Sequence, residues 1–222
     1  MSKPIVALSS GGKDSIAAVA ELIGDPAWRV ATLLTTYDET SQRVGLHGTP
    51  LSLIEAQAKA LDLPLVTVGL PEDCSNAVYE ERVADALKPL KKGGIRNVAI
   101  GDLHLDDIRA WREAQFGRLG ITPHFPLWGR DSGRLASQLI AAGWRAVVCC
   151  VDAEQLDPKF LGRAWDADLL GELGPAVDPC GENGEFHTFV FDGPLFERPV
   201  AVRSGRRWIT HGRFHMLDLL PA

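Results

Sequence analysis

Residues 5–23 of this chain, IVALSSGGKDSIAAVAELI, decide its fold. The apolar run at 5–8 is typical of a strand buried in a parallel sheet, and the run at 16–23 suits a helix. Between them lies a loop, residues 9–15, that contains two adjacent glycines and a lysine. The stretch therefore predicts a strand, a glycine-rich loop and a helix, in that order.

The loop has the chemistry of a phosphate-binding site. Gly11 and Gly12 allow the backbone to approach a ligand closely, and the first N–H groups and the dipole of the following helix attract an anion. The loop is not a Walker sequence, which has four residues between its first glycine and its Gly-Lys pair. A plain Gly-Gly turn with a solvated lysine is the alternative, and the flanking strand and helix count against it. We expect the whole loop to bind the phosphates of a nucleotide: Ser9, Ser10, Gly11, Gly12, Lys13, Asp14 and Ser15.

Composition and charge bound the kind of protein. A chain of 222 residues that is 45% hydrophobic and 23% charged is an ordinary globular protein. Its net charge of −6 argues against a nucleic-acid partner, which normally requires an excess of Lys and Arg. No apolar run is long enough to span a membrane, and the first residues lead directly into a strand, so we expect a cytoplasmic protein with no membrane partner. The four cysteines lack C-x-x-C spacing, and we predict no protein-held metal site.

Strands and helices alternate through the first half of the chain. Further strands are predicted at 29–34, 64–68 and 97–100, with helices at 51–61, 75–90 and 108–119. This alternation predicts an α/β fold, a doubly wound parallel sheet with right-handed crossovers. A rigid segment with two prolines, 123–130, then leads to a smaller α+β region with a helix at 133–142 and a strand at 146–151. We predict two domains, 1–122 and 123–222.

Ligands of such sheets bind beyond the carboxyl ends of the strands, and two candidate residues fall there. Asp102 follows the strand at 97–100, where its carboxylate could hold magnesium-bound water or a substrate ammonium. Its alternative role is that of an acid at a helix N-terminus. His47 lies in a polar loop at the same edge and could be either a site residue or a surface residue.

A second informative stretch is 177–194, VDPCGENGEFHTFVFDGP. Its turn carries Glu182 and Glu185, and His187 then enters a strand on which Glu185, His187 and Phe189 would share a face. Two acids and an imidazole near a flexible turn could bind a cation, orient ammonia or act as a general base. The turn dipeptide Asn183-Gly184 fits a simple polar hairpin end equally well.

The loop resembles that of the PP-loop ATP-pyrophosphatases, in the adenine nucleotide alpha hydrolase (HUP) superfamily. Further motifs resemble the diphthine–ammonia ligase family along nearly the whole chain: Gly101-Asp102, residues 126–130 (PLWGR), 161–163 (LGR), 181–188 (GENGEFHT) and 192–194 (DGP). The resemblance implies a nucleotide-binding domain followed by a smaller domain, with the substrate in the cleft between them. It also implies that ATP, with Mg²⁺, adenylates a carboxylate, that pyrophosphate leaves, and that ammonia then forms an amide.

The resemblance also implies roles for particular residues. The backbone at Leu34 and Thr35 would receive adenine, with Gly101 and Asp102 completing the nucleotide site. The expected catalytic residues are Lys13, Asp14, Ser15 and Glu185. The expected substrate-binding residues are His47, Asp102, Trp128, Gly181, Glu182, Glu185, His187 and Thr188. The partners would be ammonia and a carboxylate on a small molecule or peptide, and a homodimer is compatible with the sequence.

One departure from the family pattern bears on the substrate. The diphthamide enzymes carry an acid where this chain has His187, and diphthine carries a trimethylammonium group that favours acids or aromatic faces. The sequence of residues 180–188, CGENGEFHT, resembles the bacterial branch of the diphthine–ammonia ligase family. We therefore expect the same chemistry on a carboxylate other than diphthine. Two alternatives stay open: a sensor that binds ATP without turnover, and a tRNA sulfur transferase, for which Cys180 would be the reactive thiol.

Overall fold

The computed structural model describes residues 1–222, and its centre is a sheet of five parallel strands. These strands are β1 (Lys3–Leu8), β2 (Trp28–Asp38), β5 (Leu65–Leu70), β6 (Asn97–Ala99) and β7 (Thr122–His124). They lie in the order β5-β2-β1-β6-β7, and every neighbouring pair is parallel. The winding therefore reverses between β1 and β6, which places a ligand crevice at the carboxyl ends of these strands.

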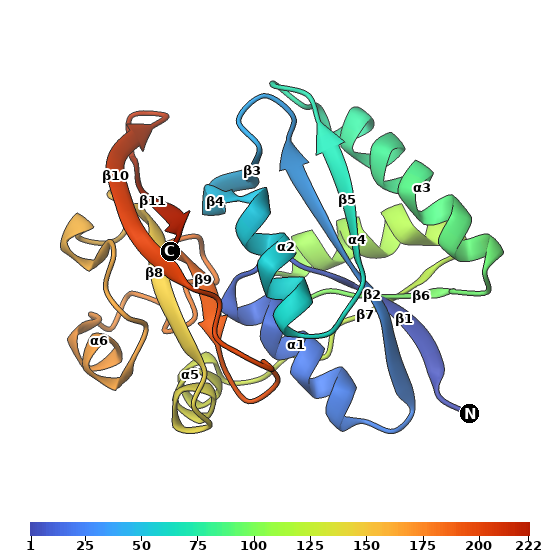
Figure 1. Ribbon diagram of the computed structural model, residues 1–222, viewed down its shortest axis with the longest axis horizontal. Coiled ribbons are helices and arrows are strands. Elements are labelled where there is room, and N and C mark those ends of the chain that lie inside the picture. The colour runs from blue at the N-terminus through green and yellow to red at the C-terminus, as the bar shows by residue number, and fades with distance from the viewer.

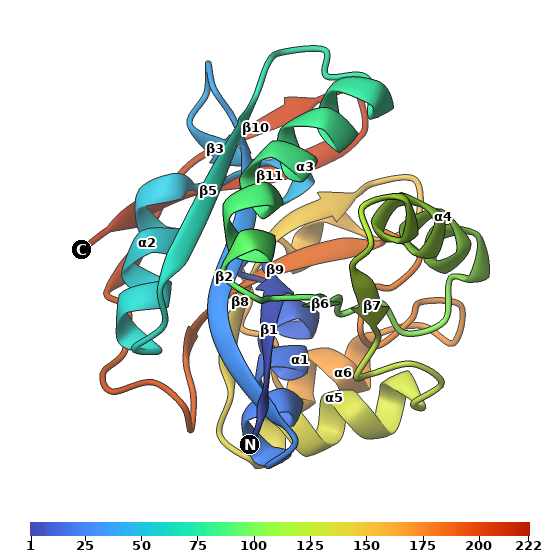
Figure 2. The same cartoon turned by 90° about the vertical axis from the view of Figure 1, so that its right-hand side faces the viewer.

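Helices cover both faces of this sheet (Figures 1 and 2). α1 (Lys13–Gly24) and α2 (Leu51–Ala60) lie on one face, and α3 (Asn76–Lys92) and α4 (Asp106–Arg118) lie on the other. Burial follows the sequence pattern, because Ile16, Val19 and Leu22 recur at helical spacing on α1 and are all buried. The predicted doubly wound α/β fold is confirmed.

The polar loop after β2 has more structure than the sequence predicts. β2 itself runs four residues beyond its predicted end, to Asp38. Two short strands, β3 (Arg43–Val44) and β4 (Thr49–Pro50), then add an antiparallel edge to the sheet. A single 3₁₀ turn, η1 (Gly45–His47), connects them. This edge fixes the position of His47 beside the phosphate loop.

The rest of the chain builds a second, antiparallel sheet in the order β10-β11-β8-β9. Its strands are β8 (Arg145–Asp152), β9 (Phe186–Asp192), β10 (Val202–Thr210) and β11 (Phe214–Pro221). α5 (Ser132–Ala141), η2 (Pro158–Phe160) and α6 (Ala167–Glu172) complete this region. None of the helices in the structure combines the length and the apolar character needed to cross a membrane.

The two sheets share one hydrophobic core. α1 and α2 lie between them (Figure 1), and a cluster of 37 buried residues runs from the first sheet through these helices into the second. Polar contacts reinforce this junction, since the amide N–H of Val190 donates to the carbonyl of Gly11 at 2.9 Å. The second sheet is thereby held directly against the glycine loop. The division into two domains, 1–122 and 123–222, stays a prediction.

Candidate active site

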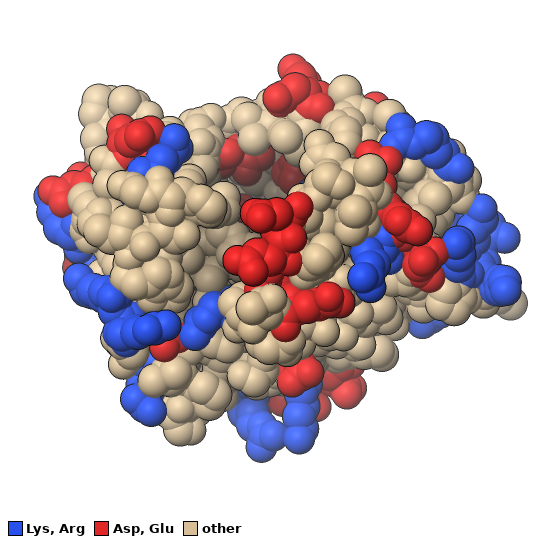
Figure 3. Space-filling model, turned by 90° about the horizontal axis from the view of Figure 1, so that it is seen from above, with Lys and Arg blue, Asp and Glu red and all other residues tan.

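A cavity of about 290 Å³ opens where β1, β2 and β6 end. Seen from above, the surface is hollowed near its centre and acidic side chains surround the opening (Figure 3). The cavity brings together most of the predicted site residues: Ser9, Ser10, Lys13, Asp14, Ser15, Leu34, Thr35, His47, Gly101, Asp102, Glu182, His187 and Thr188. Both halves of the chain therefore contribute to one pocket.

The glycine loop is held closely by its neighbours. Gly11 has a φ of +79°, and a Cβ there would lie 2.4 Å from Ile54 Cδ1. A Cβ on Gly12 would lie 2.7 Å from the His47 ring. The N–H of Lys13 donates to the Thr188 hydroxyl at 3.1 Å, which ties the start of α1 to β9. Gly11 and Gly12 lie behind the cavity wall and shape the loop, because only glycine fits both positions.

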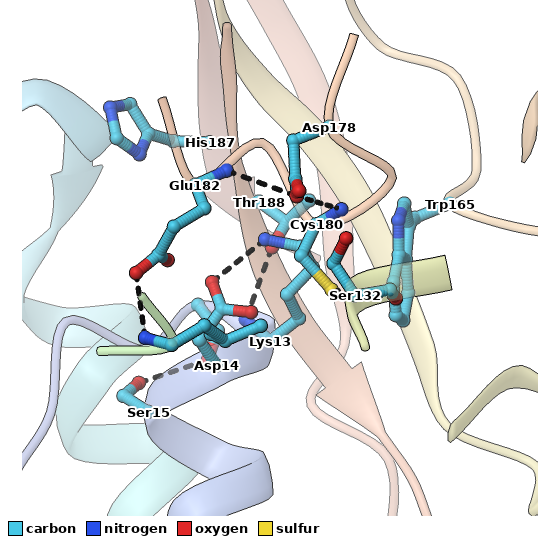
Figure 4. Close-up of polar contacts among 12 residues, drawn as sticks. Lys13, Asp14, Ser15, Ser132, Trp165, Asp178, Cys180, Glu182, His187 and Thr188 are labelled. Atoms are coloured by element: carbon cyan, nitrogen blue, oxygen red, sulfur yellow. Dashed lines mark hydrogen bonds and ion pairs between the residues drawn. The ribbon is translucent and has the colours of Figure 1, made fainter. Parts of the chain in front are cut away.

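Lys13 is the cation at the centre of the site, with only 4% of its side chain exposed. Its Nζ lies 2.7 Å from Asp14 Oδ2 and 5.2 Å from the centre of the Phe186 ring. Burial lowers the pKa of Lys13, but the nearby Asp14, Cys180 and Glu182 outweigh this effect and the pKa is raised. Lys13 therefore stays an ammonium at neutral pH. Figure 4 shows it beside Asp14 and Thr188, below the turn that carries Glu182.

Three carboxylates line the same cavity: Asp14, Asp102 and Glu182. Burial raises the pKa of each of them, and for Glu182 it reaches about 7. Glu182 Oε1 accepts a hydrogen bond from the N–H of Leu103 at 2.6 Å. One buried oxygen of Asp14, Oδ1, and one of Asp102, Oδ2, have no hydrogen-bond partner. The carboxylates of the site thus include two buried oxygens without a hydrogen-bond partner.

Gly101 explains how Asp102 reaches the loop. A Cβ at residue 101 would lie 2.8 Å from the backbone carbonyl of Asp14, so only glycine allows this close approach. Asp106 and Asp107 occupy the first turn of α4, whereas Asp102 lies before the helix and in the pocket. The position therefore favours a site role for Asp102 over the helix-terminus alternative.

His47 and His187 stack against each other at the edge of the pocket, with ring centres 4.5 Å apart. His47 Nδ1 lies 3.1 Å from the carbonyl of Thr188. Burial, together with the charge of Lys13, lowers the pKa of His47 to about 4 and that of His187 well below its ordinary value. Both rings are consequently neutral at pH 7, and the buried Nε2 of His187 has no partner.

Besides Gly11 and Gly12, three predicted residues do not line the pocket: Glu185, Gly181 and Trp128. The Glu185 carboxylate is buried in its own turn, where it accepts hydrogen bonds from the N–H of Asp178 at 2.8 Å and that of Asn183 at 3.0 Å. Gly181, with a φ of +64°, shapes the same turn. The Trp128 ring instead packs under the guanidinium of Arg109, 4.6 Å from it. The carboxylate of Glu185 therefore stabilises its own turn and is not open to substrate.

The expected common face of Glu185, His187 and Phe189 is wrong. Glu185 precedes β9, and its carboxylate stays in the turn. His187 lines the pocket, whereas Phe189 lies in the core. The pairing of β8 with β9 shifts register between Val148 and Cys150, so that one residue of β8, Cys149, is extra at this point.

Six residues of the pocket wall were not predicted as site residues: Leu8, Thr36, Val44, Tyr79, Ile100 and Arg112. The two with the largest polar side chains are Tyr79 on α3 and Arg112 on α4. Each lies within a helix, with no glycine, repeat or spacing to mark it. Cys180 is fully buried, and burial raises the pKa of its thiol to about 12. This thiol is protonated at neutral pH, which argues against a role as a nucleophile.

A parallel sheet with a glycine loop after its first strand, and a charged crevice where its winding reverses, defines a nucleotide-binding α/β protein of the adenine nucleotide alpha hydrolase class. The family model for the diphthamide synthase N-terminal domain matches residues 3–123, and that for the C-terminal domain matches residues 131–218. The chain belongs to the diphthamide synthase family.

Named relatives agree with this assignment. The chain is 30% identical to the diphthine–ammonia ligase of Bos taurus over 233 residues, which cover 93% of this chain and 85% of that protein. It is 31% identical to the diphthine–ammonia ligase of Homo sapiens over 226 residues, covering 90% and 83% of the two chains.

Proposed function

We propose that this protein is an ATP-dependent ligase that forms an amide from a carboxylate and ammonia and releases AMP and pyrophosphate. The observation that carries this proposal is the junction of the two sheets at one cavity. The buried Lys13 of the glycine loop lines this cavity together with Asp102 of the first half and Glu182 of the second. A module that only bound nucleotide would have no need of this second set of acids.

The glycine loop is suited to bind the phosphates. In the first step a carboxylate oxygen of the substrate attacks the α-phosphorus, and the bond to the bridging oxygen of pyrophosphate breaks. The ammonium of Lys13 and the N–H groups at the start of α1 would offset the charge that develops on the departing pyrophosphate. Ammonia then attacks the acyl carbon, the bond to AMP breaks, and the nitrogen loses a proton.

The residues present fit a magnesium ion, although no three acidic, histidine or cysteine side chains stand close enough together to hold a metal alone. Mg²⁺ commonly binds to one or two carboxylates together with phosphate oxygens. Asp14 and Asp102 would supply these carboxylates, since each has a buried oxygen without a partner. When bound, the ion would neutralise phosphate charge in a pocket that already holds three acids.

The pocket supports a carboxylate substrate other than diphthine. His187 lines the cavity as a neutral imidazole, which offers no charge to a trimethylammonium group. Glu185, the nearest acid in sequence, is turned away and bound within its own loop. The nitrogen donor would be free ammonia.

The test follows the fate of α- and γ-labelled ATP with Mg²⁺, ammonium and an extract of small molecules. AMP and pyrophosphate should appear only with the extract, and Lys13→Ala should abolish them. Lys59→Ala, which removes an exposed lysine at the end of α2, is the matched control and should retain turnover. ATP that binds but stays intact with every extract would instead favour a sensor, and ADP with phosphate would refute the ligase.

A further inference from the structure

A second cavity adjoins the pocket and differs from it in chemistry. This cavity, which we call the annex, has a volume of about 370 Å³ and shares Thr36, Tyr79 and Arg112 with the pocket. Its remaining walls come from β5, from the loop that follows β5, and from α3 and α4, with Leu70 and Trp111 among them. The annex therefore lies on the far side of Arg112 from the glycine loop.

The guanidinium of Arg112 is held in a defined position between the two cavities. Its Nη1 donates to the Tyr79 hydroxyl at 2.9 Å. Its Cζ lies 4.8 Å from the centre of the Trp111 ring and 5.9 Å from that of Tyr79. Its Nε is buried and has no hydrogen-bond partner. The only hydrogen bond of this guanidinium is the one from Nη1, so Nη2 is left to donate to a carboxylate.

The distribution of charge separates the annex from the pocket. The pocket is lined by Asp14, Asp102 and Glu182, whereas none of the seven residues that line the annex carries a carboxylate. An anion in the annex would meet Arg112 with no acid in the annex wall itself, although the charge of Arg112 also acts on Asp102 on the pocket side. Apolar contact is available there from Leu70 and from the Trp111 ring, which would suit the uncharged body of a small acid.

The adenine base has a better-matched position within the pocket. Leu8, Leu34 and Val44 line the pocket close to the glycine loop and offer an apolar wall to a neutral base. The ring nitrogens of adenine can accept a neutral hydrogen bond from a guanidinium, whereas a carboxylate forms the stronger, charge-assisted pair. This comparison assigns the nucleotide to the pocket and leaves the annex for the second substrate.

We propose that the annex binds the acceptor of the ligase reaction, a small carboxylic acid with an apolar or aromatic body whose carboxylate accepts hydrogen bonds from Arg112. This inference rests on the proposed function and specifies its substrate class. Arg112 would hold the acid at the boundary of the two cavities, where its second oxygen can face the α-phosphate of the nucleotide. Trp111 and Leu70 would contact the body of the acid.

The test uses phenylacetate as a probe, with saturation-transfer NMR to measure binding in the presence of Mg²⁺ and a non-hydrolysable α,β-methylene analogue of ATP. Phenylacetamide, which has the same shape without the charge, is the comparison ligand. We expect phenylacetate to bind at least tenfold more tightly than phenylacetamide, the factor expected for a charge-assisted hydrogen bond. Equal binding of the two probes, or no binding of either, would overturn the proposal.

Arg112→Gln should weaken phenylacetate binding at least tenfold and should weaken binding of the nucleotide analogue by a clearly smaller factor, since Arg112 also lines the pocket. The matched control is Arg109→Gln, because Arg109 lies one turn earlier on α4 and stacks on Phe125 and Trp128, outside both cavities. An equal loss of nucleotide affinity in Arg112→Gln would assign the annex to the nucleotide and refute the proposal.

Two of these measurements do not depend on the folding of the Arg112→Gln variant. The comparison of phenylacetate with phenylacetamide on the unaltered protein decides the question even where Arg112→Gln fails to fold. The affinity for the nucleotide analogue is measured separately. Absence of nucleotide binding would count against the ligase itself, whereas nucleotide binding without a preference for phenylacetate would refute only the role of the annex.

Discussion

Glu182 should make nucleotide binding depend on pH near neutrality. Burial raises the pKa of this carboxyl to about 7, with Asp14 and Asp102 adding to the effect against the hydrogen bond from Leu103. A group with that pKa is roughly one-tenth ionised at pH 6 and nine-tenths ionised at pH 8. If the ionised form is needed to bind the magnesium–nucleotide complex, affinity should rise about tenfold between these two pH values.

The assay is isothermal titration of the protein with Mg²⁺ and the α,β-methylene analogue of ATP at several values between pH 6 and 8. Glu182→Gln keeps the acceptor for the Leu103 N–H and removes the titration, so its affinity should stay near the low-pH value of the unaltered protein. The nucleotide itself ionises to the same extent in both titrations, so the difference between the variant and the unaltered protein isolates the contribution of Glu182. An identical pH dependence in Glu182→Gln would refute the reasoning, as would an affinity that falls with rising pH.

The raised pKa of Glu182 also predicts how the stability of the ligand-free protein changes with pH. An unfolded Glu ionises near its ordinary pKa of 4.5, whereas Glu182 in the folded protein keeps its proton up to about 7. Folding is therefore progressively destabilised as pH rises from about 4.5 to 7. A shift of this size would correspond to about 3 kcal/mol for a fully buried group, and solvent screening of the partly exposed carboxylate reduces it to about 1–2 kcal/mol. Glu182→Gln should thus melt at a higher temperature than the unaltered protein at pH 8, with little difference at pH 4.5.

Three other changes test separate parts of the site. Gly101→Ala would place a methyl group 2.8 Å from the Asp14 backbone and should cost about 1–3 kcal/mol of stability with a loss of nucleotide affinity; Gly117→Ala, with no atom within 4 Å, should be neutral or stabilising by thermal melting. Gln57→Leu removes the hydrogen bonds from Nε2 to the carbonyls of Gly11 at 3.0 Å and Val190 at 2.6 Å, and chemical denaturation should show a loss of about 1–3 kcal/mol. Cys180→Ser should keep ligase turnover within about twofold, since the thiol is buried and protonated; loss of all turnover would favour sulfur transfer.

Local pattern predicts much of this fold because its causes are local. The alternation of apolar runs with helical spacing sets the order of strands and helices, and that order favours a parallel sheet. The carboxyl ends of parallel strands meet at one edge, so Asp102 and the glycine loop are brought together by topology alone. The phosphate loop and its neighbours could therefore be identified from the sequence.

Contacts between distant segments had no comparable signal. His47 meets His187, and Tyr79 meets Arg112, through packing of elements that are far apart in the chain. Glu185 looked like a site residue, but the turn it occupies uses its carboxylate to satisfy two backbone N–H groups. The register shift between β8 and β9 likewise depends on the partner strand, which a period-2 pattern in one strand does not contain.

The sequence by itself determined the nucleotide-binding half: a strand, a glycine loop, a helix and an acid at the neighbouring strand end, all set by local propensity and parallel topology. Only the tertiary structure decided which side chains of the second half reach the pocket and which are buried within their own turn. It also decided that Arg112 stands between two cavities of different charge. The physical reason is that side-chain direction and ionisation depend on the neighbours that packing supplies, and burial of Glu182 and His187 arises only when the second sheet closes against α1.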